Sequence, residues 1–264
     1  IVIMDASLWI AKTGLTAQQT RMQVISNNLA NVNTTGFKKD RAVFEDLLYQ
    51  NIVPAGGQAD AENETPTGLM LGTGTRVVAT EKTHAQGNII TTENALDVAI
   101  TGDGFLAVQQ ADGSLAYTRD GGLKISSEGL LVTAGGQPIV PAINIPQNAA
   151  SITIGRDGTV TAELANSGGA AQVGQLQLSR FVNNSGLAPI GRNLMQQTNA
   201  SGDPIISIPG EDGAGMLMQG SLEASNVNVV EEMVNMIETQ RAYEVNSKAI
   251  AAADGMLRFL NNNL

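Results

Sequence analysis

The chain contains no cysteine, one histidine and only 3% aromatic residues. Without cysteine it cannot form a disulfide, a thiolate-ligated metal site or a thiol nucleophile. Because His84 is the sole imidazole, a site built from several histidines is excluded, and a Ser-His-Asp triad has one candidate base. These absences remove several large classes of enzyme and metalloprotein.

Charge is also sparse, and most of it is negative. The 264 residues include 15 Lys+Arg and 25 Asp+Glu, for a formal net charge of −10. Nucleic-acid binding depends on clustered basic residues, so we expect no nucleic-acid partner. No apolar run approaches the roughly 18 residues of a membrane-spanning helix. The first residues also lack the basic and apolar regions of a Sec-type signal peptide.

Apolar residues recur at alternating spacings of three and four in the first part of the chain, from Asp5 to Val32. This repeat of 3.5 residues is typical of a coiled-coil helix. We expect Asp5 to cap the helix, which should end within residues 31–36, where Gly36 can adopt a positive φ. The repeat positions are Leu8, Ala11, Leu15, Gln18, Met22, Ile25, Leu29 and Val32.

A second long helix is predicted from Asn228 to about Leu260. Asn228 and Glu231 have the spacing of a capping box. Acidic residues in the first turn also stabilise the helix through its dipole. Because the helix carries two apolar stripes, we expect it to contact more than one neighbour. The first stripe contains Val229, Met233, Met236, Gln240, Tyr243, Ser247, Ile250, Asp254 and Leu257. The second stripe contains Ala242, Val245, Ala249, Ala252, Met256 and Phe259.

The central part of the chain predicts short β-strands. Asp-Gly pairs separate apolar or alternating runs, which is a strong hairpin signal. The arrangement favours a meander or sandwich. We expect strands at 96–100, 105–109, 115–119, 123–126, 130–133, 152–155, 160–163, 173–181, 205–208 and 216–222.

Two segments before this region are less regular. Residues 37–50 fit either a short helix after Asp40 or an extended path. Residues 51–74 are rich in glycine and proline and predict a long extended arm, which we expect to lie along a neighbouring subunit. A long arm without regular structure is unusual in a compact domain unless it has a function.

We therefore predict an α+β fold. Long N- and C-terminal helices pair in a coiled-coil or inner-tube layer, and a mainly antiparallel central β domain is built of short strands. The expected parts are an N-terminal axial helix at 1–36, a connector arm at 37–75, a central β domain at 76–224 and a C-terminal axial helix at 225–264.

The sequence lacks the surrounding elements that a catalytic or cofactor-binding motif would need. Residues 102–107 match G-x-G-x-x-G/A, but a strand follows where a dinucleotide site needs a helix. No G-x-S-x-G motif supplies a nucleophile for His84, and no calcium-binding loop is present. We expect no catalytic residue, no metal and no cofactor.

The terminal helices instead predict self-association. At 1.5 Å per residue they would be about 40 and 50 Å long. Their apolar surface exceeds what one two-helix seam covers, and association through non-identical faces generates open helical polymers. An intramolecular hairpin packed on the β domain is the alternative. The expected assembly residues are Leu8, Leu15, Met22, Ile25, Leu29, Val32, Val229, Met233, Met236, Tyr243, Val245, Ile250, Met256 and Leu257.

Motifs along the whole chain resemble the bacterial flagellar rod and hook family of axial proteins. Within that family, residues 40–50 and the arm to Gly74 are more similar to distal rod subunits than to proximal rod or hook subunits. The N-terminal motifs are Ser7–Leu15 and Ile25–Lys38. The central motifs are Leu96–Ile100, Gly102–Phe105 and Tyr117–Gly121, and the C-terminal motifs are Ser225–Val229 and Gln240–Glu244.

The resemblance implies a structural subunit of a drive shaft, with terminal helices of many copies forming an inner tube and β domains an outer layer. It implies torque transmission from motor to hook. The implied partners are other copies of the chain, proximal rod proteins, the hook protein, the P- and L-ring proteins, a rod cap and the flagellar type III export apparatus. The implied location is the basal body, crossing the periplasm, after export without a cleaved signal. A proximal rod or hook subunit and a rod-associated hydrolase are the alternatives.

Overall fold

The computed structural model describes residues 2–54, 56, 67–164 and 169–262. The chain divides into two compact units. Unit 1 comprises residues 1–29, 40–81 and 228–264, and unit 2 comprises residues 30–39 and 82–227. The chain therefore passes between the units at four points, and each unit contains segments that are distant in sequence.

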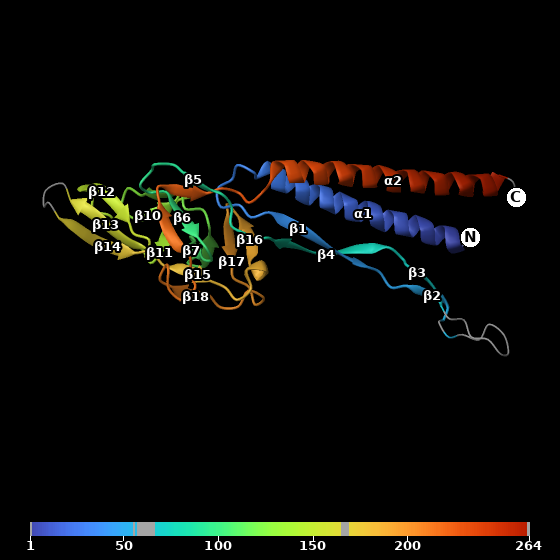
Figure 1. The fold of residues 1–264 in the computed structure, drawn as a ribbon, viewed down its shortest axis with the longest axis horizontal. Helices are drawn as coiled ribbons and strands as arrows, with labels where there is room; N and C mark the ends of the chain where they lie inside the picture. Colours follow the sequence, from blue (N-terminus) through green and yellow to red (C-terminus); the bar gives the residue numbers. More distant parts are fainter. Residues whose placement is uncertain (1, 55, 57–66, 165–168, 263–264) are drawn as a thin grey trace. The chain divides into compact units, whose positions relative to one another are not determined.

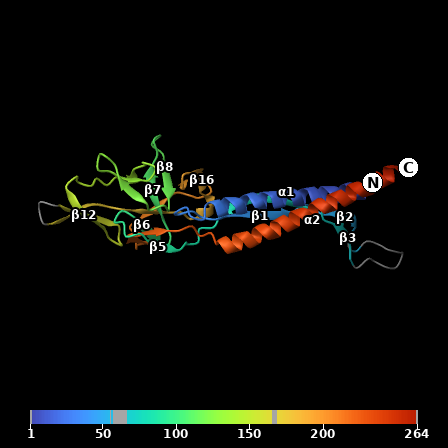
Figure 2. The ribbon, with the colours of Figure 1, turned by 90° about the horizontal axis from the view of Figure 1, so that it is seen from above.

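Unit 1 contains the two long helices and a two-stranded ribbon (Figures 1 and 2). In the ribbon β1 pairs with β4, and β2 pairs antiparallel with β3. The helices are α1 (Val2–Ala30) and α2 (Val229–Asn262). The strands are β1 (Asp40–Asp46), β2 (Gln50–Val53), β3 (Leu69–Leu71) and β4 (Thr75–Lys82).

The helix ends follow local backbone chemistry. The predicted cap at Asp5 is wrong, because α1 already begins at Val2 and a capping residue needs a non-helical backbone. α1 stops at Ala30, one residue before the predicted interval of 31–36, and the predicted positive φ of Gly36 is confirmed at 67°. The predicted cap of α2 is also confirmed, because Asn228 Oδ1 accepts the N–H groups of residues 230 and 231 at 3.0 and 3.4 Å.

The segment 37–50 takes the extended path, since it forms β1 and begins β2. A short helix after Asp40 is therefore wrong. The expected arm at 51–74 includes the end of β2 and the whole of β3, which pair with each other. Residues 55 and 57–66 of that arm lie outside the described residues.

Unit 2 is built of short strands around a seven-stranded sheet. Its order is β16-β17-β8-β7-β15-β18, and β11 also pairs with β7. The strands are β7 (Phe105–Gln109), β8 (Leu115–Thr118), β11 (Ile139–Val140), β15 (Leu178–Arg180), β16 (Ala188–Gly191), β17 (Leu194–Gln196) and β18 (Ile205–Ser207). The strand pairs of this sheet are antiparallel.

Smaller antiparallel sheets complete unit 2. They are the three-stranded β12-β13-β14 and the pairs β6-β19, β5-β20 and β9-β10. A short 3-10 helix spans Asn184–Gly186. The strands are β5 (Ile89–Thr91), β6 (Val98–Thr101), β9 (Leu123–Ile125), β10 (Leu131–Thr133), β12 (Ala149–Ile154), β13 (Thr159–Leu164), β14 (Ala170–Gln175), β19 (Met216–Gln219) and β20 (Ser221–Glu223). The α+β fold class is confirmed.

The core of unit 2 lies between these strands. Its fully buried members include Ile100, Leu106 and Leu178, each stabilising the fold by about 1.5–3 kcal/mol relative to an exposed side chain. A smaller aromatic cluster stacks edge to face, with 6.1 Å between the ring centroids of Phe105 and Phe181 and 4.7 Å between those of Tyr117 and Phe181. Apolar burial therefore holds unit 2 as a domain of its own.

Turn chemistry sets the strand spacing. The Asp112 carboxylate accepts the Ser114 N–H at 2.9 Å, and Gly113 between them has φ 83°. In the segment 102–107 the chain turns from β6 into β7, so it is a strand-turn-strand element and lacks the helix of a dinucleotide site. Within the described part of the chain, no helix is long and apolar enough to cross a membrane.

We predict that Gly121→Ala destabilises unit 2 by about 3 kcal/mol or more. A Cβ on Gly121 would collide with the backbone carbonyl of Val98, which begins a buried strand. Urea unfolding of the purified chain measures the change. Gly255→Ala is the control, because a Cβ there meets open space and should leave the unfolding of unit 2 unchanged. Equal stability of the two variants would contradict the packing at Gly121.

Candidate assembly surface

The contacts that the structure gives between α1 and α2 run antiparallel and join small or polar residues. At one end Asn28 Nδ2 lies 3.5 Å from Glu232 Oε2, and further along Arg21 Nη2 lies 3.4 Å from Asn235 Oδ1. A Cβ built on Gly14 would lie 3.1 Å from Asn246 Nδ2, so the helices approach closely there. Hydrogen bonds and small side chains thus form this contact.

The face that α2 turns toward α1 carries no large apolar side chain among its most buried positions. Glu232, Thr239 and Ala253 are buried and are separated by seven and fourteen residues, which places them on one line along the helix. The apolar stripes of α2 therefore flank this line. In the usual coiled coil apolar residues fill such positions on both helices.

Most of the expected assembly residues remain accessible in the single chain. The exposed ones are Val229, Met233, Tyr243, Val245 and Met256. The half-buried ones are Leu8, Leu15, Met22, Leu29, Val32, Met236, Ile250 and Leu257, and Ile25 is the one that is buried.

Helix geometry places the half-buried residues along one edge of the seam. At 100° per residue, Leu15 and Met22 lie about 100° around α1 from the side that contacts α2. Met236 and Ile250 lie about 40–60° around α2 from the line of Glu232, Thr239 and Ala253, and the rotation has the same sense. Because the helices are antiparallel, rotations of the same sense from the seam bring both groups to the same face of the pair. The two helices thus share one apolar face.

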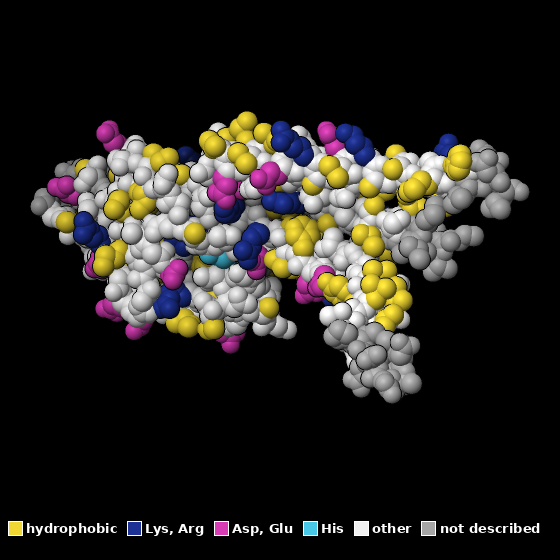
Figure 3. Space-filling model, turned by 45° about the vertical axis from the view of Figure 1, so that its right-hand side comes forward, with side chains coloured by type: hydrophobic (Ala, Val, Ile, Leu, Met, Phe, Trp, Pro, Cys, Tyr) yellow, Lys and Arg dark blue, Asp and Glu magenta, His cyan; other side chains and the backbone are white. Residues whose placement is uncertain are grey.

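The second stripe of α2 lies on the other side of the line of Glu232, Thr239 and Ala253 from Met236 and Ile250. Val245 is 65% exposed, and Phe259 at the other end of the stripe is more exposed still. One helix cannot cover both the second stripe and the α2 part of the shared apolar face, because these lie on different sides of α2. Figure 3 shows hydrophobic side chains along the helices of unit 1.

The ribbon carries further exposed apolar side chains that the sequence analysis did not assign to assembly. Leu48 is 89% exposed, and Tyr49, Ile52 and Met70 are also exposed on the same two-stranded element. Figure 3 shows hydrophobic side chains gathered on it. The run of apolar residues at 47–49 is a signal that could have identified this surface.

Asn28 joins three elements of unit 1, and sequence reasoning did not give it this role. Its Nδ2 donates to the Asp40 carbonyl at 2.9 Å, and its Oδ1 accepts the Asp40 N–H at 2.8 Å. The side-chain amide therefore replaces a strand partner for β1 while it also contacts Glu232 on α2. An amide is suited to this position because it offers both a donor and an acceptor.

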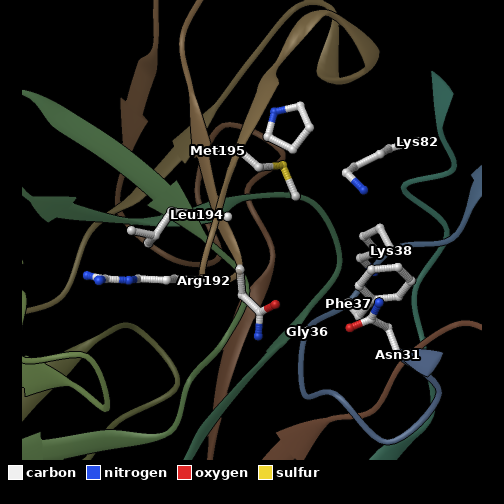
Figure 4. Close-up of a pocket in the computed structure, with 11 residues that line it drawn as sticks. Asn31, Gly36, Phe37, Lys38, Lys82, Arg192, Leu194 and Met195 are labelled. Carbon is white, nitrogen blue, oxygen red and sulfur yellow. The ribbon is translucent and has the colours of Figure 1, made fainter. Parts of the chain in front are cut away.

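In unit 2, a pocket of about 210 Å³ opens beside the segment that follows α1 (Figure 4). The Lys82 ammonium lies 5.1 Å from the centre of the Phe37 ring, and Arg192 extends away from both. The lining side chains are amides, cations and apolar groups, with no carboxylate, hydroxyl or imidazole. No group of metal-ligating side chains was found among the described residues.

Two titratable groups near this segment have shifted pKa values. Burial lowers the pKa of Lys38, the Arg119 guanidinium lowers it further, and Glu223 opposes both effects. Burial also lowers the pKa of His84 to about 4, with smaller contributions from Lys38, Arg119 and Lys82. The His84 ring packs edge to face on Phe105, with 5.7 Å between centroids. His84 is thus neutral at pH 7.

Comparison with known proteins identifies relatives over nearly the whole chain. Family models match residues 8–38 ("Flagella basal body rod protein"), 99–162 ("Flagellar hook protein FlgE/F/G D1 domain") and 218–263 ("Flagellar basal body rod FlgEFG protein C-terminal"). The flagellar basal-body rod protein FlgG of Buchnera aphidicola is 55% identical over 98% of this chain and 99% of its own length. FlgG of Borreliella burgdorferi is 48% identical over 98% of each chain. FlgG of Bacillus subtilis is 37% identical over 97% of this chain and 98% of its own length.

We predict that acid weakens unit 2 through His84. Its pKa is lower in the folded chain than its ordinary value of 6.5, so the unfolded chain binds a proton first as the pH falls. Stability is fully present above pH 6.5, and up to about 3 kcal/mol is lost on acidification to pH 4.

Urea unfolding between pH 7 and pH 4 measures this loss. His84→Phe keeps the aromatic contact and should remove the His84 part of the pH dependence, while other acid-sensitive groups still contribute in both proteins. Identical pH profiles for the wild type and His84→Phe would show that His84 is not a buried neutral group.

Proposed function

The chain belongs to the FlgG family of flagellar basal-body rod proteins, and from that premise we propose how its surfaces build the rod. It is a structural subunit of the distal rod and not an enzyme, and torque transmission is the general role of the shaft. It is located in the flagellar basal body and assembles into the rod with other flagellar proteins. What remains to be assigned is which residues make the contacts between copies.

The contacts between copies are made by the apolar stripes of α1 and α2. The observation that carries this proposal is that the given contacts between α1 and α2 are polar or small, whereas exposed or half-buried apolar residues of α2 flank them on both sides. Burial of one large apolar side chain stabilises a contact by about 1.5–3 kcal/mol, more than a typical net hydrogen bond of about 1 kcal/mol. Packing between copies therefore outweighs packing within one copy.

Each part of the chain then has its own place in the polymer. We assign residues 1–36 and 225–264 to the inner tube and residues 76–224 to the outer layer. The connector at 37–75 lies along a neighbouring subunit through its exposed apolar side chains, such as Leu48 and Tyr49. Stiffness follows from this plan, because each α2 is packed against several neighbours at once.

The finer partners follow from the position of a distal rod subunit. We assign contacts with the proximal rod proteins at one end and the hook protein at the other, with the P- and L-ring proteins around the shaft. A rod cap and the flagellar type III export apparatus act during assembly. The subunit crosses the periplasm after export without a cleaved signal. Immunogold labelling between proximal rod and hook would support this order, and label along the hook would contradict it.

We predict that Leu29→Asp abolishes rod completion. Leu29 is half-buried at the edge of the seam, so the substitution puts an unpaired charge into the face that copies share. Electron microscopy of isolated basal bodies and swimming assays measure the loss, and unfolding of unit 2 should be unchanged. Leu29→Met retains the apolar side chain and should assemble normally. Normal motility of Leu29→Asp would rule out the shared face.

We predict that Val245→Asp also blocks assembly while leaving the single chain intact. Val245 is exposed, so its replacement should change the free energy of unfolding of the monomer by no more than about 0.5 kcal/mol. Its effect on rods tests whether the second stripe has a neighbour. The matched control is Val245→Ile, which should build complete rods. Complete rods from the Asp variant would show that this stripe faces solvent in the shaft.

A further inference from the structure

Glu223 gathers three separate segments of unit 2 around one buried carboxylate. Its Oε1 accepts from Lys38 Nζ at 2.6 Å and from the Gly87 N–H at 2.9 Å. Its Oε2 accepts from Arg119 Nε at 2.9 Å. The side chains of Lys38 and Glu223 are 0% exposed. The segments after α1, after β4 and before α2 are thus tied at a single point.

Asn226 ties the same segments through its side-chain amide. Its Oδ1 accepts the Lys39 N–H at 2.7 Å, and its Nδ2 donates to the carbonyls of Thr83 and Ala85 at 2.8 and 3.0 Å. Lys38 Nζ donates to the same Ala85 carbonyl at 2.7 Å. We call Lys38, Arg119, Glu223 and Asn226 together the crossing clamp.

The crossing clamp lies close to the points where the chain leaves unit 2. The four passages between the units follow residues 29, 39, 81 and 227. Clamp bonds reach backbone or side-chain atoms at 38–39, 83–87 and 223–226, within a few residues of three of these passages. Force that travels along the covalent chain through these three passages crosses these segments.

Stability alone is a poor explanation for this arrangement. The desolvation of buried charged groups offsets much of their mutual attraction, and proteins with apolar replacements are often as stable. Here two cations share one carboxylate, so one positive charge in excess is held away from water. Hydrogen bonds are directional, whereas apolar contacts are not. They therefore fix the position of each chain segment along its length.

We propose that the crossing clamp is a positioning device that prevents the segments at 36–39, 83–87 and 223–226 from sliding past one another when the shaft is under torque. This inference rests on the proposed function, and it adds residues that no apolar stripe contains. The clamp residues position the crossing segments and make no contact with other copies in this account.

Hydrogen exchange of the purified chain tests the clamp without any rod. In Lys38→Met the Arg119–Glu223 pair remains neutral, but the bond from residue 38 to Ala85 is lost. Amides at 36–39 and 83–87 should exchange roughly tenfold faster, while amides of β7 keep their wild-type rates. Lys124→Met, which removes an exposed lysine of the same unit, should change neither set. A uniform increase that includes β7, or no increase, overturns the proposal.

Motor measurements then test the role under load. Cells carrying Lys38→Met should complete rods and turn a small bead at wild-type speed, but lose speed with a large bead. Equal loss at both loads, or none, overturns the proposal. If Lys38→Met does not fold, the group of Lys38, Glu223 and Arg119 is needed for stability, and the proposed positioning role of these three residues is overturned. Asn226→Ser, which leaves the ions intact, then decides by the same exchange pattern whether any part of the clamp positions the crossings.

Discussion

The constraint on which the structure depends is that α2 carries more apolar surface than one chain can cover. Its face toward α1 is polar and small, with Glu232, Thr239 and Ala253 buried in line. An isolated helix of this kind gains little from its own partner, and long helices in water are marginal without tertiary packing. From the exposed stripes we propose that order in the helices is a consequence of assembly.

A second theme is the use of amides and ions where chain segments meet. Asn28 binds both backbone groups of Asp40 in unit 1, and Asn226 binds three backbone groups in unit 2. Both sit in terminal motifs that resemble the rod and hook family. Their physical role explains why asparagine occupies these positions: aspartate would lose the donor, and an apolar residue would lose both interactions. The buried carboxylate of Glu223 extends the same logic to three segments.

The helices and most central strands could be predicted because their signals are local. The 3.5-residue repeat located α1, Asn228 located the start of α2, and Asp-Gly pairs separated strands such as β7 and β8. The rest depends on distant pairing. For example, β5 pairs with β20 across more than a hundred residues, and the sequence of neither strand indicates which strand it pairs with. Lys38, Arg119 and Glu223 could not be predicted as buried, because charged residues are normally expected at the surface. The assembly residues were identified as apolar stripes, but their position beside a polar seam needed the structure.

The central claim is that the terminal helices are ordered by contacts between copies. Limited proteolysis with mass spectrometry, applied to dilute chain and to assembled rods, tests it most directly. The account predicts that dilute chain loses residues before about Gly36 and after about Val227, whereas rods retain both ends. Resistance of both ends in the dilute chain would contradict it. The helices would then be a stable intramolecular pair, and assembly would have to depend on the ribbon and unit 2.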